Sequence, residues 1–157
     1  DRWLVSREEV TRAVQEAFGA WDVWKLYADA FCWESVAATW AGEFGTKRVV
    51  LYSTNNRNKL AASVRAFRNA LADGSLTHDG NGDLARHLAN AHRRPLAQRD
   101  ESGAPLYILQ KARPDSPHRI NGAVAAVLSW QARTDAVSAG ALQPGPPVEE
   151  DYHVGWA

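Results

Sequence analysis

The sequence predicts an α/β domain, and two observations carry that prediction. Several segments place apolar residues at helical spacing, and short runs rich in β-branched and aromatic residues lie between them. Strands that alternate with helices favour a layered α/β structure over a helical bundle. The 157 residues suffice for one domain with a substantial core and are too few for two domains of ordinary size.

The first half of the chain is predicted to alternate helix, strand, helix and strand. Ser6 and Glu9 form a capping box that starts the first helix. The β-favouring residues of WDVWKLYAD end abruptly at Asp29, which places an acid at the end of a strand. Gly45 supplies the stop of the second helix. In order, these elements are a helix at 6–18, a strand at 21–29, a helix at 31–45 and a strand at 47–54.

The second half is predicted to hold three helices and a β-hairpin. Leu60, Val64, Phe67 and Leu71 recur at helical spacing. A Gly-Asn-Gly break precedes the next helix, and a Ser-Gly turn separates the two extended runs of the hairpin. Residues 143–157 are rich in Pro and Gly, are acidic, and are interpreted as a tail. In order, the elements are a helix at 59–74, a short extended run from 75, a helix from about 83, a hairpin at 95–113 and a closing helix at 117–139.

Composition limits the classes of function. Equal numbers of basic and acidic side chains, 18 of each, give no global basic field, so any contact with DNA comes from local patches. Cys32 is the single cysteine, which excludes an internal disulfide and suits a reducing compartment. The longest apolar stretch, at 123–130, is too short for a bilayer, so no membrane partner is expected. Because the sequence has no Met, we expect it to be part of a longer polypeptide.

Three segments in order resemble the large terminase subunit of tailed bacteriophages, in the part that holds its RNase H-like nuclease. VWKLYAD with AFCWESVAATWAGEFG resembles the family's strand, catalytic acid and helix. LTHDGNGDLARHLANAHR resembles a distinctive family segment, and KARPDSPHRINGAVAAVLSWQAR resembles its closing helix. The resemblance runs from about Trp3 to Ala141. It implies an RNase H-like mixed sheet flanked by helices over residues 1–142, here without its first strands.

The resemblance also implies a nuclease centre in which three acids hold two Mg²⁺ or Mn²⁺ ions. Asp29 corresponds to the second acid, and the first is expected on a strand upstream of Trp3. In RINGAVA, Asn121 stands where the family has the third acid. An amide offers a carbonyl oxygen to a metal but no negative charge, so it holds a second cation less well than a carboxylate.

Asn121 therefore has several interpretations. Natural decay, a deliberate inactivating change and natural use of the amide are three that keep it in the nuclease centre. A fourth is structural, since Asn is common as a cap or first-turn residue at a helix start. The sequence leaves these alternatives open.

Histidines and acids gather at 78–92. His87 and His92 are five positions apart and point to different faces of a helix, which disfavours a zinc site. Asp83 and His87 are four apart and are expected to pair across one helical turn. His78 and Asp79 precede the Gly-Asn-Gly loop, and the resemblance suggests that they contribute to the rim of the active site.

Basic residues near the end of the hairpin are candidates for contact with DNA phosphates. These candidates are Lys111, Arg113 and Arg119. Four more basic residues could extend the contact: Arg57, Lys59, Arg93 and Arg94. For each residue, the alternative is an ordinary charged side chain in solvent. The Trp residues fall in periodic segments and are expected to pack between elements rather than to stack on bases: Trp21, Trp24, Trp33, Trp40 and Trp130.

The function implied by the resemblance is metal-dependent cleavage of concatemeric viral DNA during packaging. The implied partners are double-stranded DNA, the portal protein and the small terminase subunit, in the cytoplasm of the bacterial host. The alternative is a non-catalytic fragment or decayed copy that docks on DNA or on the portal.

Overall fold

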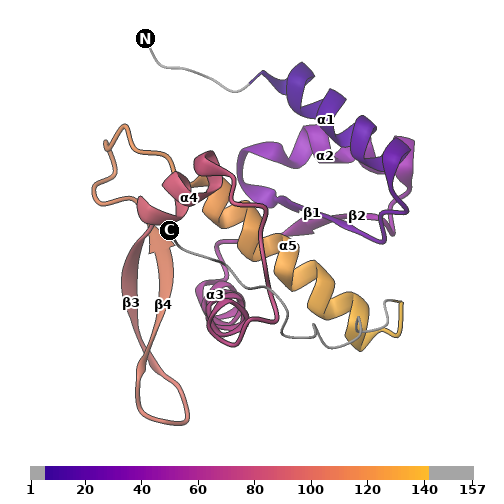
Figure 1. The fold of residues 1–157 in the computed structure, drawn as a ribbon. Coiled ribbons are helices and arrows are strands. Elements are labelled where there is room, and N and C mark those ends of the chain that lie inside the picture. The colour runs from indigo at the N-terminus through magenta and orange to yellow at the C-terminus, as the bar shows by residue number, and fades with distance from the viewer. Residues whose placement is uncertain (1–5, 142–157) are drawn as a thin grey trace, which may run out of the picture.

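The computed structural model describes residues 6–141, in which helices and strands alternate (Figure 1). The predicted mixed α/β class is confirmed. The tail predicted at 143–157 lies outside the described residues. No helix in the described part combines the length and apolarity needed to cross a membrane. The elements are α1 (Arg7–Ala20), β1 (Leu26–Asp29), α2 (Ala30–Phe44), β2 (Val49–Tyr52), α3 (Arg57–Ala72), α4 (Gly82–Ala89), β3 (His92–Arg99), β4 (Pro105–Gln110) and α5 (Asn121–Ser138).

The four strands of the described residues form two separate sheets. β1 and β2 are parallel, with Leu26 opposite Val49. β3 and β4 are antiparallel, with His92 opposite Gln110, and β4 packs on α3. The single mixed sheet that was expected is therefore not formed among these residues, because the hairpin strands bond only to each other.

The parallel sheet lies between two layers of helices. On one face, Ala28 and Val49 are buried with Ala37 and Trp40 of α2. On the other face, Tyr27 on β1 and Tyr52 on β2 stack with ring centroids 5.6 Å apart. The hydroxyls of these tyrosines bond to α5 and α3, respectively. Each strand thus alternates between an α2-facing side and a side that faces α3 and α5, as expected for a covered parallel sheet.

A second core joins α3 to the hairpin and to α5. It contains Leu60, Val64 and Phe67 of α3, together with Ile108 of β4 and Val127 of α5. The helical spacing that predicted α3 is thereby explained, because the apolar stripe of the helix faces both neighbours. Figure 1 shows the hairpin beside α3, crossing the direction of the helix axis and extending away from the parallel sheet.

The first strand is shorter than predicted because a side chain binds the backbone before it. Nε and Nη2 of Arg48 donate to the carbonyl of Val23 at 3.0 and 2.6 Å, and Val23 N donates to the carbonyl of Trp21. Extended pairing therefore begins only at Leu26. Trp21 is 71% exposed, so its predicted packing role is wrong, whereas Trp40 is 3% exposed, as expected for a packing residue.

Other boundaries also differ from the expectation. The closing helix begins at Asn121 rather than at 117, because Lys111 and His118 bond to Ser116 in a turn that precedes the helix. β3 begins at His92, three residues before the predicted hairpin, and the extended run expected from residue 75 is loop. The Ser6 cap is confirmed by its bond to Glu9 N.

Candidate functional site

Asp29 stands at the carboxyl end of β1, the edge at which α/β proteins commonly bind their ligands. Its Oδ1 accepts hydrogen bonds from Phe31 N at 3.1 Å and from Thr54 Oγ1 at 2.7 Å. The first bond makes Asp29 the N-cap of α2, and the second ties it to the residues that follow β2. Oδ2 receives no hydrogen bond from the described residues, so one carboxylate oxygen is held in place and the other is available.

Asn121 is the first residue of α5, and its side chain is exposed. The N-cap is Ile120, which has no side chain able to cap the helix. His87 of α4 takes that part, because its Nδ1 accepts a hydrogen bond from Gly122 N at 2.7 Å. The prediction that Asn121 caps the helix is therefore wrong, and the alternative prediction, that Asn121 lies in the first turn, is confirmed.

The close approach of α4 to α5 requires glycine at position 122. A Cβ on Gly122 would lie 2.7 Å from His87 Nδ1 and 3.2 Å from its Cγ. The predicted Asp83–His87 pair is not formed. Asp83 bonds to Arg86 instead, and His87 turns toward α5. His87 is thus explained as a helix cap rather than as a metal ligand.

β1 meets α5 near the C-terminal end of the helix. Tyr27 donates from its hydroxyl to Asp135 Oδ2 at 2.5 Å. Asp135 lies fourteen residues after Asn121, which is about 21 Å along the helix axis. No hydrogen bond or ion pair joins Asp29 to Asn121 within residues 6–141, and their convergence stays a prediction.

A chain of hydrogen-bonded polar side chains, buried at Tyr52 and Ser63 and partly buried elsewhere, links β2 to β1. Tyr52 is hydrogen-bonded to Ser63 Oγ at 2.8 Å, and Ser63 Oγ donates to Gln131 Oε1 at 2.8 Å. Gln131 Nε2 donates to Asp135 Oδ1 at 2.8 Å, and Tyr27 completes the chain. Burial, followed by the bond to Asp135, raises the pKa of Tyr27 well above its usual range.

Sequence reasoning missed Asp135, the acid of α5 that actually contacts β1. Its signal was an acid in the last turns of a small-residue helix, four positions after Gln131. Both carboxylate oxygens already accept hydrogen bonds, from Tyr27 and Gln131. Asp135 therefore links elements of the fold and does not offer a free oxygen to a cation.

The acidic and other metal-binding side chains of the described residues bear on the expected two-ion centre. Asp29 offers one unbonded oxygen, and no group of three or more His, Cys, Asp or Glu side chains within residues 6–141 is placed to hold a metal. Two hard cations need several anionic oxygens. The expected pair of Mg²⁺ or Mn²⁺ ions stays a prediction.

His78 and Asp79 form the loop between α3 and α4. His78 Nδ1 accepts from Gly80 N at 3.0 Å, and Asp79 Oδ1 accepts from Asn81 N at 2.9 Å. His78 also lines a cavity of about 350 Å³ between α3, α4 and α5, in which Trp130 is an apolar wall. The two residues shape this loop, and their contribution to an active-site rim stays a prediction.

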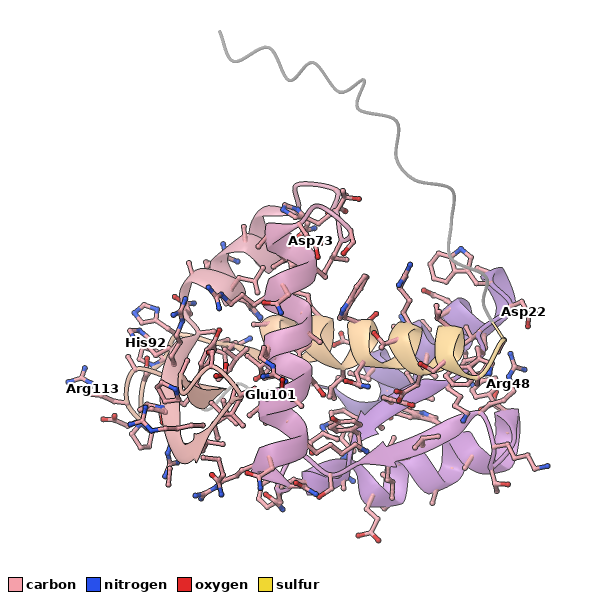
Figure 2. All side chains as sticks on the ribbon, turned by 90° about the horizontal axis from the view of Figure 1, so that it is seen from below. Asp22, Arg48, Asp73, His92, Glu101 and Arg113 are labelled. Atoms are coloured by element: carbon pink, nitrogen blue, oxygen red, sulfur yellow. The ribbon has the colours of Figure 1, made fainter. Side chains whose placement is uncertain are left out.

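The three predicted DNA contacts come from one segment, the connection between β4 and α5. Lys111 Nζ donates to the carbonyl of Ser116 at 3.1 Å, so part of its donor capacity is used within the fold. Figure 2 shows Arg113 projecting away from the molecule. Arg119 is exposed, and its carbonyl accepts from Asn90 Nδ2 at 3.2 Å.

The chain is related to proteins of bacteriophages. It is 31% identical over 140 residues to the Gene 13 protein of Mycobacterium phage D29, an alignment that covers 83% of this chain and 22% of that protein. It is equally similar to the Gene 13 protein of Mycobacterium phage L5, with 83% of this chain and 23% of that protein covered. The chain thus spans less than a quarter of the length of these relatives. No known protein family and no solved structure matches it.

Proposed function

We propose that the chain is the C-terminal part of the nuclease domain of a phage terminase large subunit. In this role it contributes to metal-dependent cleavage of concatemeric viral DNA in the cytoplasm of the host. The observation that carries the proposal is the position of Asp29, an acid with one unbonded oxygen at the carboxyl end of a parallel strand. The ordered resemblance of three segments and the bacteriophage relatives give further support.

The proposed fold is RNase H-like in its complete form. β1 and β2 would then belong to a larger sheet completed by strands from the longer polypeptide, including the strand that carries the first acid. The parallel pairing of β1 with β2 and the packing of α5 across β1 support this arrangement. A parallel pair of strands is rarely stable without further strands and covering helices.

The residues of this chain would act on the ions and on the DNA. Mg²⁺ or Mn²⁺ would supply activated water when bound. Thr54 and the α2 N-terminus hold Oδ1 of Asp29, and Oδ2 would be the oxygen that binds the metal. Asn121 would stand in the third ligand position with a neutral oxygen. Lys111, Arg113 and Arg119 would contact phosphates, and the portal protein and small terminase subunit are the proposed protein partners.

The test uses the protein encoded by the complete reading frame that contains this chain. With Mn²⁺ and plasmid DNA, Asp29→Asn should lower the cleavage rate at least about tenfold, because the amide keeps the helix cap but removes the charged ligand. Asp22→Asn is the matched control. Asp22 is an exposed acid beside Arg48 (Figure 2), and it precedes the start of β1, whereas Asp29 is at the carboxyl end of this strand. Equal cleavage by wild type and Asp29→Asn would remove Asp29 from the nuclease centre.

A second candidate function is a non-catalytic module that docks on DNA or on the portal. The observation that favours it is the amide at Asn121, together with the use of Asp29 Oδ1 as a helix cap. This function predicts that the complete protein binds duplex DNA without metal-dependent cleavage. Cleavage that depends on Asp29 would exclude it.

A further inference from the structure

The charges of this neutral chain are strongly segregated. Ten of the 18 Lys and Arg residues, but only three of the 18 Asp and Glu residues, lie in α3 and in residues 92–119. The hairpin part of the second segment is next to α3, because β4 packs on this helix. The basic residues are Arg57, Lys59, Arg65, Arg68, Arg93, Arg94, Arg99, Lys111, Arg113 and Arg119, and the acids are Asp100, Glu101 and Asp115.

Three of these arginines surround one hollow between α3 and the hairpin. Arg65 and Arg68 of α3 and Arg93 of β3 line a cavity of about 390 Å³ together with Tyr107 of β4. The Arg93 guanidinium lies over the ring of Tyr107, another lining residue, 5.0 Å from its centroid, and this contact restrains its position. The Arg68 guanidinium has no hydrogen bond or ion pair within residues 6–141. Cationic donors therefore converge on this space.

Asp100 is the one acid that lines the same cavity. Its Oδ1 accepts from Ser102 N at 2.9 Å, Ser102 Oγ at 2.6 Å and Ala104 N at 3.0 Å, so the hairpin turn holds the carboxylate still. The hydroxyl of Ser102 is the main cause of a lowered pKa for Asp100. Oδ2 lies 3.8 Å from Arg65 Nη1. An anionic group is thus already placed beside one of the three arginines.

We propose that this arginine pocket (Arg65, Arg68, Arg93 and Asp100) holds a backbone phosphate of duplex DNA, and that Asp100 competes with the phosphate for Arg65. The choice of DNA rests on the proposed function. The competition is a regulatory feature of the pocket itself. A phosphate can accept two hydrogen bonds from an arginine guanidinium, whereas Asp100 Oδ2 lies 3.8 Å from Arg65 Nη1. The phosphate would therefore displace Asp100 from Arg65, and the hydrogen bonds to Asp100 Oδ1 would keep the turn folded.

The surroundings of the arginine pocket favour an extended polyanion over a small anion. α3 is 16 residues long, about 24 Å, and carries no acid. Helical spacing places Arg57, Arg65 and Arg68 on one side of it, whereas Lys59 lies over the Tyr52 ring. Duplex DNA presents one negative charge per about 1.7 Å of its axis, so a surface of this length meets several phosphates. The pocket would fix the register of the backbone, and the other arginines would add affinity without sequence preference.

Binding is measured by fluorescence anisotropy with a labelled 20-bp duplex as the probe, in EDTA and over a series of salt concentrations. Arg68→Gln and Arg93→Gln should each weaken binding at least about threefold and reduce the slope of log K against log salt by about 1. Arg7→Gln and Arg12→Gln, on the exposed face of α1, are the matched controls and should leave both quantities unchanged. Losses as large in the controls would overturn the proposal.

The competition by Asp100 gives a test in the opposite direction. Asp100→Asn keeps the Oδ1 acceptor of the turn but frees Arg65, so it should tighten binding about threefold or more. Glu101→Gln removes the same charge from the next, exposed residue, whose side chain has no partner in the described part. Equal gains in the two variants would show a bulk charge effect and overturn the role of Asp100.

These measurements separate the arginine pocket from the nuclease. They need no divalent metal and no cleavage, so a failed nuclease assay leaves them unchanged. The arginine pocket would be rejected as a phosphate site if neither arginine substitution weakened DNA binding. If the same protein still cleaved DNA in a way that depends on Asp29, the proposed nuclease function would stand. A single-stranded probe of the same length that binds more tightly than the duplex would also overturn the assignment to duplex DNA.

Discussion

Tyr27 on β1 and Asp135 on α5 are joined by a 2.5 Å hydrogen bond across 108 positions of the sequence. The bond anchors the closing helix to the parallel sheet and continues through Gln131 and Ser63 to β2. Hydrogen bonds to charged groups contribute more than neutral ones. The position of α5 over β1 therefore depends on this contact as well as on apolar packing.

Replacing Tyr27 by Phe should lower the free energy of unfolding by about 1–3 kcal/mol, because Asp135 loses a donor while the ring packing remains. Urea unfolding at pH 7 measures the change. Arg133→Gln on the same helix is a control that leaves the polar chain intact. An unchanged midpoint for Tyr27→Phe would show that the bond contributes nothing to stability.

The pH dependence of stability should also report on Tyr27. The folded chain raises the pKa of its phenol, so the unfolded chain loses this proton first, near pH 10. The stabilisation is complete below that pH and is lost as the pH rises above it. Between pH 9 and 11, wild type should lose stability more steeply than Tyr27→Phe, which is measured by urea unfolding at each pH. Parallel curves would contradict the raised pKa.

Gly122→Ala should destabilise the chain by about 1–3 kcal/mol, because the added Cβ would lie 2.7 Å from His87 Nδ1. In a His87→Ala background the same change should cost much less, since the obstructing ring is gone. Gly42→Ala on α2 is the matched control. It meets nothing within 4 Å and should stabilise by about 0.5–1 kcal/mol. Thermal unfolding of the four variants tests the contact, and an additive double mutant would refute it.

In the complete protein, Asn121→Asp should raise metal-dependent cleavage if position 121 is the third ligand, because it restores an anionic oxygen. Asn121→Ala should then change cleavage little. The acid at the start of α5 should in either case add about 0.3–1 kcal/mol of stability through the helix dipole. Plasmid cleavage and thermal unfolding are measured side by side. A gain in stability without any gain in cleavage would remove Asn121 from the centre.

The 157-residue chain alone should show little or no nuclease activity with Mg²⁺ or Mn²⁺. Under the proposed function, Asp29 would supply one carboxylate, and an amide, Asn121, would stand in the position of the third acid. Plasmid cleavage by the purified chain is the measurement. Robust cleavage that Asp29→Ala abolishes would show that other residues of the chain complete the metal centre.

Features that depend on neighbouring residues were predictable from the sequence. The Ser6 cap, the stop at Gly45 and the helical stripe of α3 each follow from residues within one or two turns. The position of Asp29 at a strand end was predictable for the same reason, because the β-favouring run stops there.

Features that depend on distant partners were not predictable. The start of β1 is set by Arg48, which lies beyond α2 and binds the backbone at Val23. The cap of α5 comes from His87, whose sequence neighbours suggested a pair with Asp83 instead. The role of Asp135 required knowing that Tyr27 faces it across the fold. In each case the residue itself could be seen in the sequence, but the distant residue that it contacts could not be predicted from its sequence neighbours.

The charges of residues 6–141 are distributed unevenly, so this neutral chain is expected to have an electric dipole moment. Its pI is about 7.2, yet near that pH α3 and residues 92–119 carry an excess of cationic side chains, and the other residues between 6 and 141 carry an excess of anionic ones. Such a molecule turns its basic side toward a polyanion before contact, over distances comparable with the Debye length of about 8–10 Å. It should therefore be retained on a cation-exchange column at its own isoelectric point, where a protein with evenly mixed charges would flow through.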